Sequence, residues 1–249
     1  MIRLISMLLL VVLLTTMAFS QITVACAANV QFAMEEIKAA YEKTNGNISV
    51  VYGASGNLTT QIKNGAPFDI FVSADTDFPD SLFAAHAAVT KPKIYAYGKL
   101  ILWTMNDALL MDGRLEFLKN NSITTIAIPD PKRAPYGRET IKALTKSGVL
   151  AAVKSRLVYG ESISQAANYV LSKAALVGFN AKSIVLAPKM KGKGKWVEVD
   201  SMLYDKIEQA AVILRYGKDN NPTVSNKFYV YLYGQQARAI FIKYGYILP

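Results

Sequence analysis

Four short segments combine small residues with hydrogen-bond donors, and together they could bind an anion. They are residues 27–29 (AAN), 53–56 (GASG), 134–137 (APYG) and 160–163 (GESI). The side chains of Asn29, Ser55 and Tyr136 can donate hydrogen bonds. Each segment is also predicted to lie where a helix begins, and the first N–H groups of a helix have no partner within it. Several helix starts that face one cleft would bind an anion without a buried Lys or Arg.

Each of these residues also has a simpler explanation when it is considered alone. Asn29 and Ser55 are common N-cap residues of helices. Tyr136 could be an ordinary aromatic residue of the surface or the core. The residue types alone therefore leave both interpretations open, and the elements around them have to be considered.

The elements that must position these segments alternate between strands and helices. Strands are predicted at residues 22–28, 48–54, 68–74, 100–105, 125–128, 157–159, 176–180 and 210–215. Helices are predicted at residues 32–46, 58–63, 139–147, 163–172, 225–232 and 235–244. Repeated βα units predict an α/β protein with mostly parallel sheets. Ligands of such sheets bind at the carboxyl ends of strands, which is where the four segments lie.

Composition argues against most catalytic and metal chemistry. The 249 residues are enough for two domains, but they include a single Cys and a single His. One Cys excludes an intramolecular disulfide and a zinc site built from several Cys. His86 lies in an Ala-rich, helix-like stretch, so a surface histidine is favoured over a general base. The GASG segment is one residue short of the G-x-S-x-G nucleophile turn. We therefore expect a binding protein and no enzyme.

Residues 1–20 have the layout of a secretory signal peptide. Arg3 gives the start a positive charge, an apolar run follows, and Ala18 and Ser20 are small residues before a cleavage site at Gln21. The alternative is a membrane anchor, but the run is shorter than the roughly 20 residues that a span needs. The mature chain is expected to be exported and periplasmic.

Two further features have ordinary interpretations. Cys26 could be a lipid-attachment site, but its place within a predicted strand favours a buried thiol. The net charge of +10 could indicate nucleic-acid binding. The basic residues are scattered, however, apart from the alternating lysines of residues 189–195, which we interpret as a solvated loop. No nucleic-acid partner is expected.

Several ordered motifs resemble one family. They are residues 27–29 (AAN), 51–58 (VYGASGNL), 61–62 (QI), 65–71 (GAPFDIF), 73–75 (SAD), 130–137 (DPKRAPYG), 161–166 (ESISQA) and 237–246 (ARAIFIKYGY). In this order they resemble the periplasmic molybdate-binding proteins of ABC importers. The resemblance extends over residues 22–247, which is nearly all of the predicted mature chain.

The resemblance implies a two-lobed type II periplasmic binding protein fold with a hinge. Its two α/β lobes would be joined by crossing segments near residues 103–104 and 208–210. Lobe one would comprise residues 21–103 and 211–249, and lobe two residues 104–210. The ligand would bind between the lobes.

The resemblance also implies the binding residues. The side chains of Asn29 and Ser55 would bind the oxyanion from lobe one, with backbone help from Ala28. Tyr136 and the backbone N–H of Ile163 would complete the site from lobe two. Ala181 stands where one branch of the family has a binding tyrosine, and the chain fits the other branch, in which the Pro-Tyr-Gly turn supplies it. Molybdenum would be bound only as the oxyanion, through these same residues, and no cofactor is expected.

The implied function is capture of molybdate, and of tungstate, by a monomer that delivers the anion to a membrane ABC permease. The alternative is a protein of the same fold for another oxyanion or solute. Ferric iron would need clustered Tyr, His or carboxylate ligands, and the four segments supply only Tyr136 and Glu161. A cytoplasmic adaptor that kept the fold is disfavoured by the signal peptide.

Overall fold

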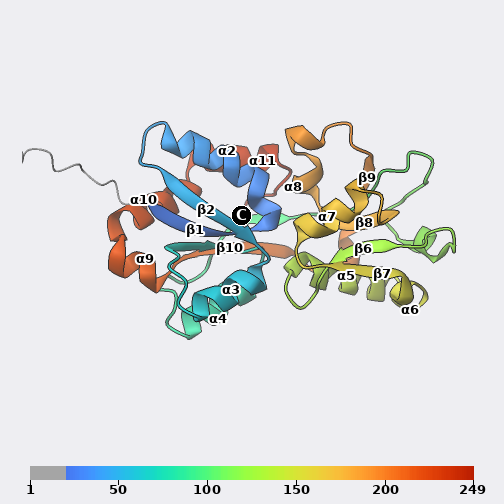
Figure 1. The fold of residues 1–249 in the computed structure, drawn as a ribbon, viewed down its shortest axis with the longest axis horizontal. Helices are drawn as coiled ribbons and strands as arrows, with labels where there is room; N and C mark the ends of the chain where they lie inside the picture. The colour runs from blue at the N-terminus through green and yellow to red at the C-terminus, as the bar shows by residue number, and fades with distance from the viewer. Residues whose placement is uncertain (1–20) are drawn as a thin grey trace, which may run out of the picture.

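The computed structural model describes residues 21–249, so the predicted signal peptide lies outside the described residues. Two five-stranded sheets form the centres of two lobes that lie side by side (Figure 1). The first sheet has the order β2-β1-β3-β10-β4 and consists of β1 (Ile22–Ala27), β2 (Ile48–Gly53), β3 (Ile70–Val72), β4 (Lys93–Gly98) and β10 (Ile207–Ile213). The second has the order β7-β6-β8-β5-β9 and consists of β5 (Leu100–Thr104), β6 (Ile126–Pro129), β7 (Leu157–Gly160), β8 (Val177–Ala181) and β9 (Lys195–Glu198). The α/β class and the two-lobed fold are confirmed.

Both sheets are mostly parallel, as expected, but each contains one strand that runs opposite to the other four. In the first sheet β1, β2 and β3 are parallel, and β10 runs antiparallel to β3 and β4. In the second, β6, β7 and β8 are parallel, and β5 runs antiparallel to β8 and β9. The reason is the connection of the lobes. A strand that has just crossed from the other lobe starts at the edge where the parallel strands end, so it must run the opposite way.

The two connections between the sheets differ in place from the expected crossings. β4 ends at Gly98 and β5 begins at Leu100 in the second sheet, so the first crossing lies at Lys99 and not at residues 103–104. The second crossing ends before β10 begins at Ile207, ahead of residues 208–210. The unpredicted strand β4 accounts for the first difference, because without it β5 is the next strand available to lobe one.

Helices cover both faces of the first sheet. They are α2 (Gln31–Glu42), α10 (Pro222–Leu232) and α11 (Gln235–Lys243) on one face, and α3 (Ser55–Lys63) and α4 (Asp77–Ala84) on the other. Alternate side chains of β1 serve these two cores, since successive residues of a strand point to opposite faces. Val24 and Cys26 belong to the larger core, and Ala25 packs with Leu58 of α3 and Leu82 of α4.

The second lobe repeats this layering. Its helices are α5 (Pro135–Lys146), α6 (Leu150–Val153), α7 (Ile163–Leu171) and α8 (Lys182–Val185), and α9 (Arg215–Asn220) follows β10 in the first lobe. Helices α5 and α7 lie on opposite sides of β6 (Figure 1). The larger core is continuous between the lobes, because it contains Tyr95 of β4 and Trp103 of β5.

Several residues singled out in the sequence have structural roles. Cys26 is a free, fully buried strand thiol, and burial raises its pKa. His86 is exposed and follows the end of α4. The lysine-rich segment is not all loop, since Lys195 begins the edge strand β9. Within residues 21–249, none of the helices combines the length and the apolar character that crossing a membrane requires.

Candidate functional site

A small cavity between the lobes brings the predicted site residues together. Its volume is about 10 Å³, which is room for about one water molecule. Its lining consists of Ala27, Ala28, Asn29, Gly53, Ala54, Ser55, Ala74, Ala134, Pro135, Tyr136 and Ile163. All five predicted site residues therefore line the same cavity, and every lining side chain is uncharged. Ala181, at the buried end of β8, is outside this lining.

Four helix starts converge on the cavity, and the strand registers explain why. The 3₁₀ helix η1 (Ala28–Val30) follows β1 and α3 follows β2, and the pairing of Ala27 with Gly53 places these two turns side by side. In the second lobe α5 and α7 begin after β6 and β7, whose last residues, Pro129 and Gly160, are also paired. The first N–H groups of each helix lack partners within it. The cavity thus receives partial positive charge from backbone dipoles.

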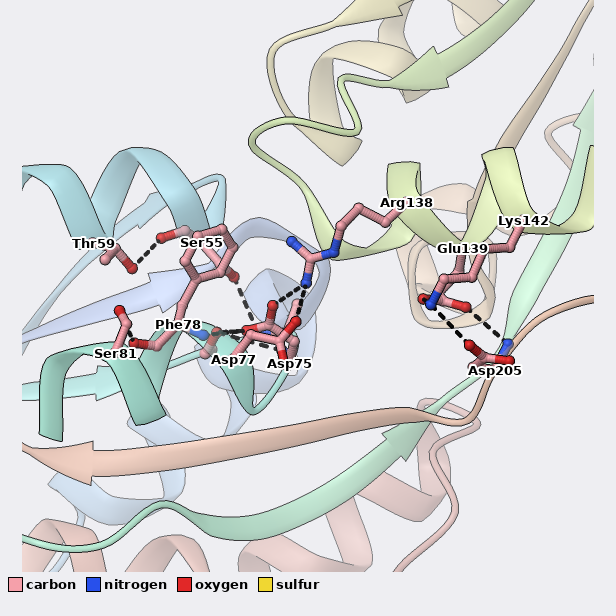
Figure 2. Close-up of polar contacts among 12 residues, drawn as sticks. Ser55, Thr59, Asp75, Asp77, Phe78, Ser81, Arg138, Glu139, Lys142 and Asp205 are labelled. Carbon is pink, nitrogen blue, oxygen red and sulfur yellow. Dashed lines mark hydrogen bonds and ion pairs between the residues drawn. The ribbon is translucent and has the colours of Figure 1, made fainter. Parts of the chain in front are cut away.

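Ser55 faces the cavity and does not cap its helix. It is the first residue of α3, whose N-cap is Ala54 without a side-chain cap bond. Its Oγ accepts a hydrogen bond from the Ala74 N–H at 3.0 Å (Figure 2). This contact uses an acceptor site of the hydroxyl, so its hydrogen remains available to donate. The N-cap interpretation of Ser55 is wrong.

Asn29 is held by a buried network. It lies inside η1, whose N-cap is Ala27, so it does not cap a helix either. Its Nδ2 donates to Gln209 Oε1 at 2.7 Å and to Tyr246 Oη at 3.1 Å. Its backbone carbonyl oxygen accepts from Ser183 Oγ of the other lobe at 2.7 Å. Both amide hydrogens therefore have protein acceptors, which differs from the expectation that the Asn29 side chain donates to the ligand. The donor that remains to Asn29 at the helix start is its backbone N–H.

Tyr136 and Ile163 supply the wall from the second lobe. Tyr136 is 2% exposed, and its Oη accepts from Gln209 Nε2 at 3.4 Å. Burial raises the pKa of Tyr136 well above its ordinary value, so its hydroxyl stays a neutral donor. Ile163 is the first residue of α7, and the capping Oγ of Ser162 accepts from the Gln165 N–H, which leaves the Ile163 N–H to the cavity.

A family comparison agrees with this arrangement. The family model described as "Bacterial extracellular solute-binding protein" matches residues 22–247. The chain belongs to this family. The predicted class, a solute-binding protein and not an enzyme, is confirmed.

Individual relatives of this solute-binding protein are named for molybdate. It is 37% identical to the molybdate-binding protein ModA of Azotobacter vinelandii, over 91% of this chain and 90% of the relative. It is also 37% identical to ModA of Rhodobacter capsulatus, over 92% and 89%. The solved periplasmic molybdate-binding protein of Azotobacter vinelandii superposes with a TM-score of 0.85 and 31% identity, covering 92% of this chain and 99% of that one. The resemblance found in the motifs is thereby confirmed.

Sequence reasoning missed the residues that support this site. Gln209 and Tyr246 hold the Asn29 amide, and Tyr95 donates to Gln209 Oε1. Gly98 lies against the Tyr136 hydroxyl, since an added Cβ would be 2.1 Å from Tyr136 Oη. One signal was present for Gln209. A polar residue within an apolar strand must find buried partners, because unpaired polar groups are costly to bury.

The lobes of the solute-binding protein also meet at the rim of the cavity. The Gly56 N–H donates to the Arg133 carbonyl oxygen at 2.9 Å. Arg138 of α5 reaches across to Asp75 and, at 3.3 Å, to Asp77 (Figure 2). Burial raises the pKa of Asp75, although its hydrogen bond with Arg138 acts in the opposite direction. The lobes are therefore closed upon each other in this structure.

A second charged cluster lies beyond the rim and outside the cavity. Lys142 contacts Glu139 at 2.8 Å and Asp205 at 2.9 Å (Figure 2). Lys146 contacts Asp205 at 2.9 Å. Hydrogen bonds from these two lysines lower the pKa of Asp205 to about 2. These ion pairs connect α5 with the second segment that joins the lobes. None of the charged residues of this cluster lines the cavity.

Proposed function

We propose that this protein captures molybdate, or tungstate, between its lobes and delivers the anion to a membrane ABC permease from the periplasm. The observation that carries the proposal is the cavity between the lobes, in which uncharged donors from four helix starts of two lobes converge. Relatives with the same fold and 37% identity are named molybdate-binding proteins, which supports this choice of ligand.

The proposed contacts use donors only. Ser55 donates its hydroxyl hydrogen, and Ala28 and Asn29 donate backbone N–H groups from lobe one. Tyr136 donates its hydroxyl hydrogen and Ile163 its backbone N–H from lobe two. A fully deprotonated tetrahedral oxyanion has only acceptors, so it matches such a lining. Phosphate near neutral pH keeps a proton that would lack an acceptor there.

Size and charge complete the selection. Sulfate carries no proton but is smaller, so we expect the fixed distance between the closed lobes to disfavour it. An uncharged lining binds the anion by dipoles alone, which favours release when the lobes part. The anion stabilises the closed arrangement because only this arrangement supplies donors from both lobes. The protein would act as a monomer, without nucleic acid or a cofactor.

A thermal-shift panel tests the proposal. The chain from Gln21 onward is heated with molybdate, tungstate, sulfate, phosphate or ferric citrate at one concentration. Molybdate and tungstate are expected to raise the unfolding temperature, since a hundredfold excess over Kd stabilises by about 2.7 kcal/mol. A shift with another solute alone, or no shift at all, would contradict the proposed ligand.

A further inference from the structure

Gln209 lies at the point where the two lobes join. It is on β10, the strand that follows the second crossing, and it is fully buried. The pairing of β10 with β4 is irregular between Gln209 and Ala210. β10 pairs there with the end of β4, where Gly98 precedes the first crossing. Gln209 is therefore a buried amide on the hinge strand, next to both connections.

The contacts of Gln209 join binding residues of both lobes. Its Oε1 accepts from Asn29 Nδ2 at 2.7 Å and from the Tyr95 hydroxyl at 3.0 Å, both in lobe one. Its Nε2 donates to Tyr136 Oη of lobe two at 3.4 Å. Tyr95 and Asn29 both face the amide oxygen as donors, so they orient the amide with its nitrogen toward Tyr136.

This orientation decides what Tyr136 can do. Its hydroxyl oxygen accepts from Gln209, so its single hydrogen must point elsewhere, and Tyr136 lines the cavity. Gly98 makes the contact possible, since a Cβ there would lie 2.1 Å from Tyr136 Oη and 2.7 Å from Gln209 Nε2. The contact between Gln209 and Tyr136 thus requires a glycine at position 98.

We propose that Gln209 is the positioning residue of the site, orienting Tyr136 of one lobe and Asn29 of the other so that both present donors to the bound oxyanion. This inference rests on the proposed function. It adds that the donor direction of Tyr136 is set only when the closed lobes bring its hydroxyl against the amide of the hinge strand. The lobes then close and the Tyr136 hydroxyl becomes oriented in the same step.

A double-mutant cycle tests the inference. Molybdate binding is measured by calorimetry for the wild-type protein, Gln209→Met, Tyr136→Phe and the double variant. Met keeps the length of the side chain without its hydrogen bonds. We expect Gln209→Met to weaken binding about tenfold, as for loss of a buried hydrogen-bond partner. If Gln209 acts through Tyr136, the loss in the double variant is smaller than the product of the two single losses. The exposed Gln236→Met is the matched control and should bind as the wild type does.

Two results would overturn the inference. One is wild-type affinity in Gln209→Met, and the other is a double variant whose loss equals the product of the single losses, which is what a merely structural role gives. Ligand-free unfolding temperatures show that each variant is folded, and Gln209→Asn, which is too short to reach Tyr136, replaces Gln209→Met in the cycle if that variant does not fold. If molybdate is not the ligand, the wild-type protein will already show no binding of molybdate. The cycle is then run with the anion of the panel that binds.

Discussion

Single residues of the cavity contribute neutral hydrogen-bond donors, and they differ in whether the side chain already donates within the protein. Ser55 is the simplest case, because it is 1% exposed and its Oγ already accepts from Ala74. Asn29 differs, since its amide hydrogens are used within the protein and its effect on a ligand must pass through its position in η1. Residues whose side chains would contact the anion are therefore distinct from residues whose side chains position the site.

The residue-scale prediction concerns Ser55. Ser55→Ala removes a donor that we expect to bind the oxyanion and should weaken molybdate binding by at least about 1 kcal/mol, the cost of an unmet polar partner. Calorimetry on folded protein measures this loss. Ser172→Ala, an equal change at an exposed position, is the control and should leave the affinity unchanged. Equal affinities of the two variants would remove Ser55 from the site.

Elements are ended by local backbone geometry, and α4 shows how. His86 follows this helix with a left-handed φ of 56°. Its N–H donates to Phe83 O at 3.0 Å, and the Ala87 N–H donates to Leu82 O at 2.9 Å. These two bonds form a Schellman motif, in which Gly is the usual residue at the left-handed position. The only histidine of the chain therefore terminates a helix.

The prediction for this helix end concerns a substitution of His86. His86→Gly should increase the free energy of unfolding by about 0.5–1 kcal/mol, because relief of left-handed strain outweighs the added flexibility of the unfolded chain. Chemical denaturation measures this gain, with His86→Ala as the control that keeps a Cβ and gains nothing. Neither change should affect oxyanion binding. A large loss of affinity in His86→Ala would indicate a site elsewhere.

The whole molecule depends on contacts that hold the lobes together. Arg138 of lobe two is paired with Asp75, a largely buried carboxylate of lobe one, and its guanidinium lies 5.2 Å from the Phe78 ring centre. Removing one partner of a buried ion pair is costlier than breaking an exposed pair, since the remaining charge stays desolvated. The closed arrangement should therefore be sensitive to Arg138.

The prediction at this scale is that Arg138→Met shifts the lobes toward an open arrangement. Asp75 would keep its burial but lose its partner, so the closed state becomes less favourable and molybdate affinity falls several-fold. Small-angle scattering should give a larger radius of gyration for ligand-free Arg138→Met than for the wild type. Arg114→Met, at an exposed position of lobe two, should change neither quantity. Unchanged scattering and affinity in Arg138→Met would contradict a role in closure.

Most strands and helices could be predicted because their signals are local. The apolar run that forms β1 and the helical spacing in α2 each lie within a short window of sequence. β4 escaped prediction because its KIYAYG segment mixes exposed and buried residues at a sheet edge. The direction of β5 and β10 was also beyond local reasoning, because it follows from which lobe each strand enters.

The sequence by itself determined the four donor-bearing turns, since strand ends and helix starts depend on neighbouring residues. It also determined the cavity's lack of charge, because small and neutral residues occupy these turns. Only the tertiary structure decided which side chains hold them. Gln209 lies 180 residues from Asn29, and Tyr246 lies 217 residues from it. Contacts over such separations leave no local periodicity, so they exist only once lobe one has folded.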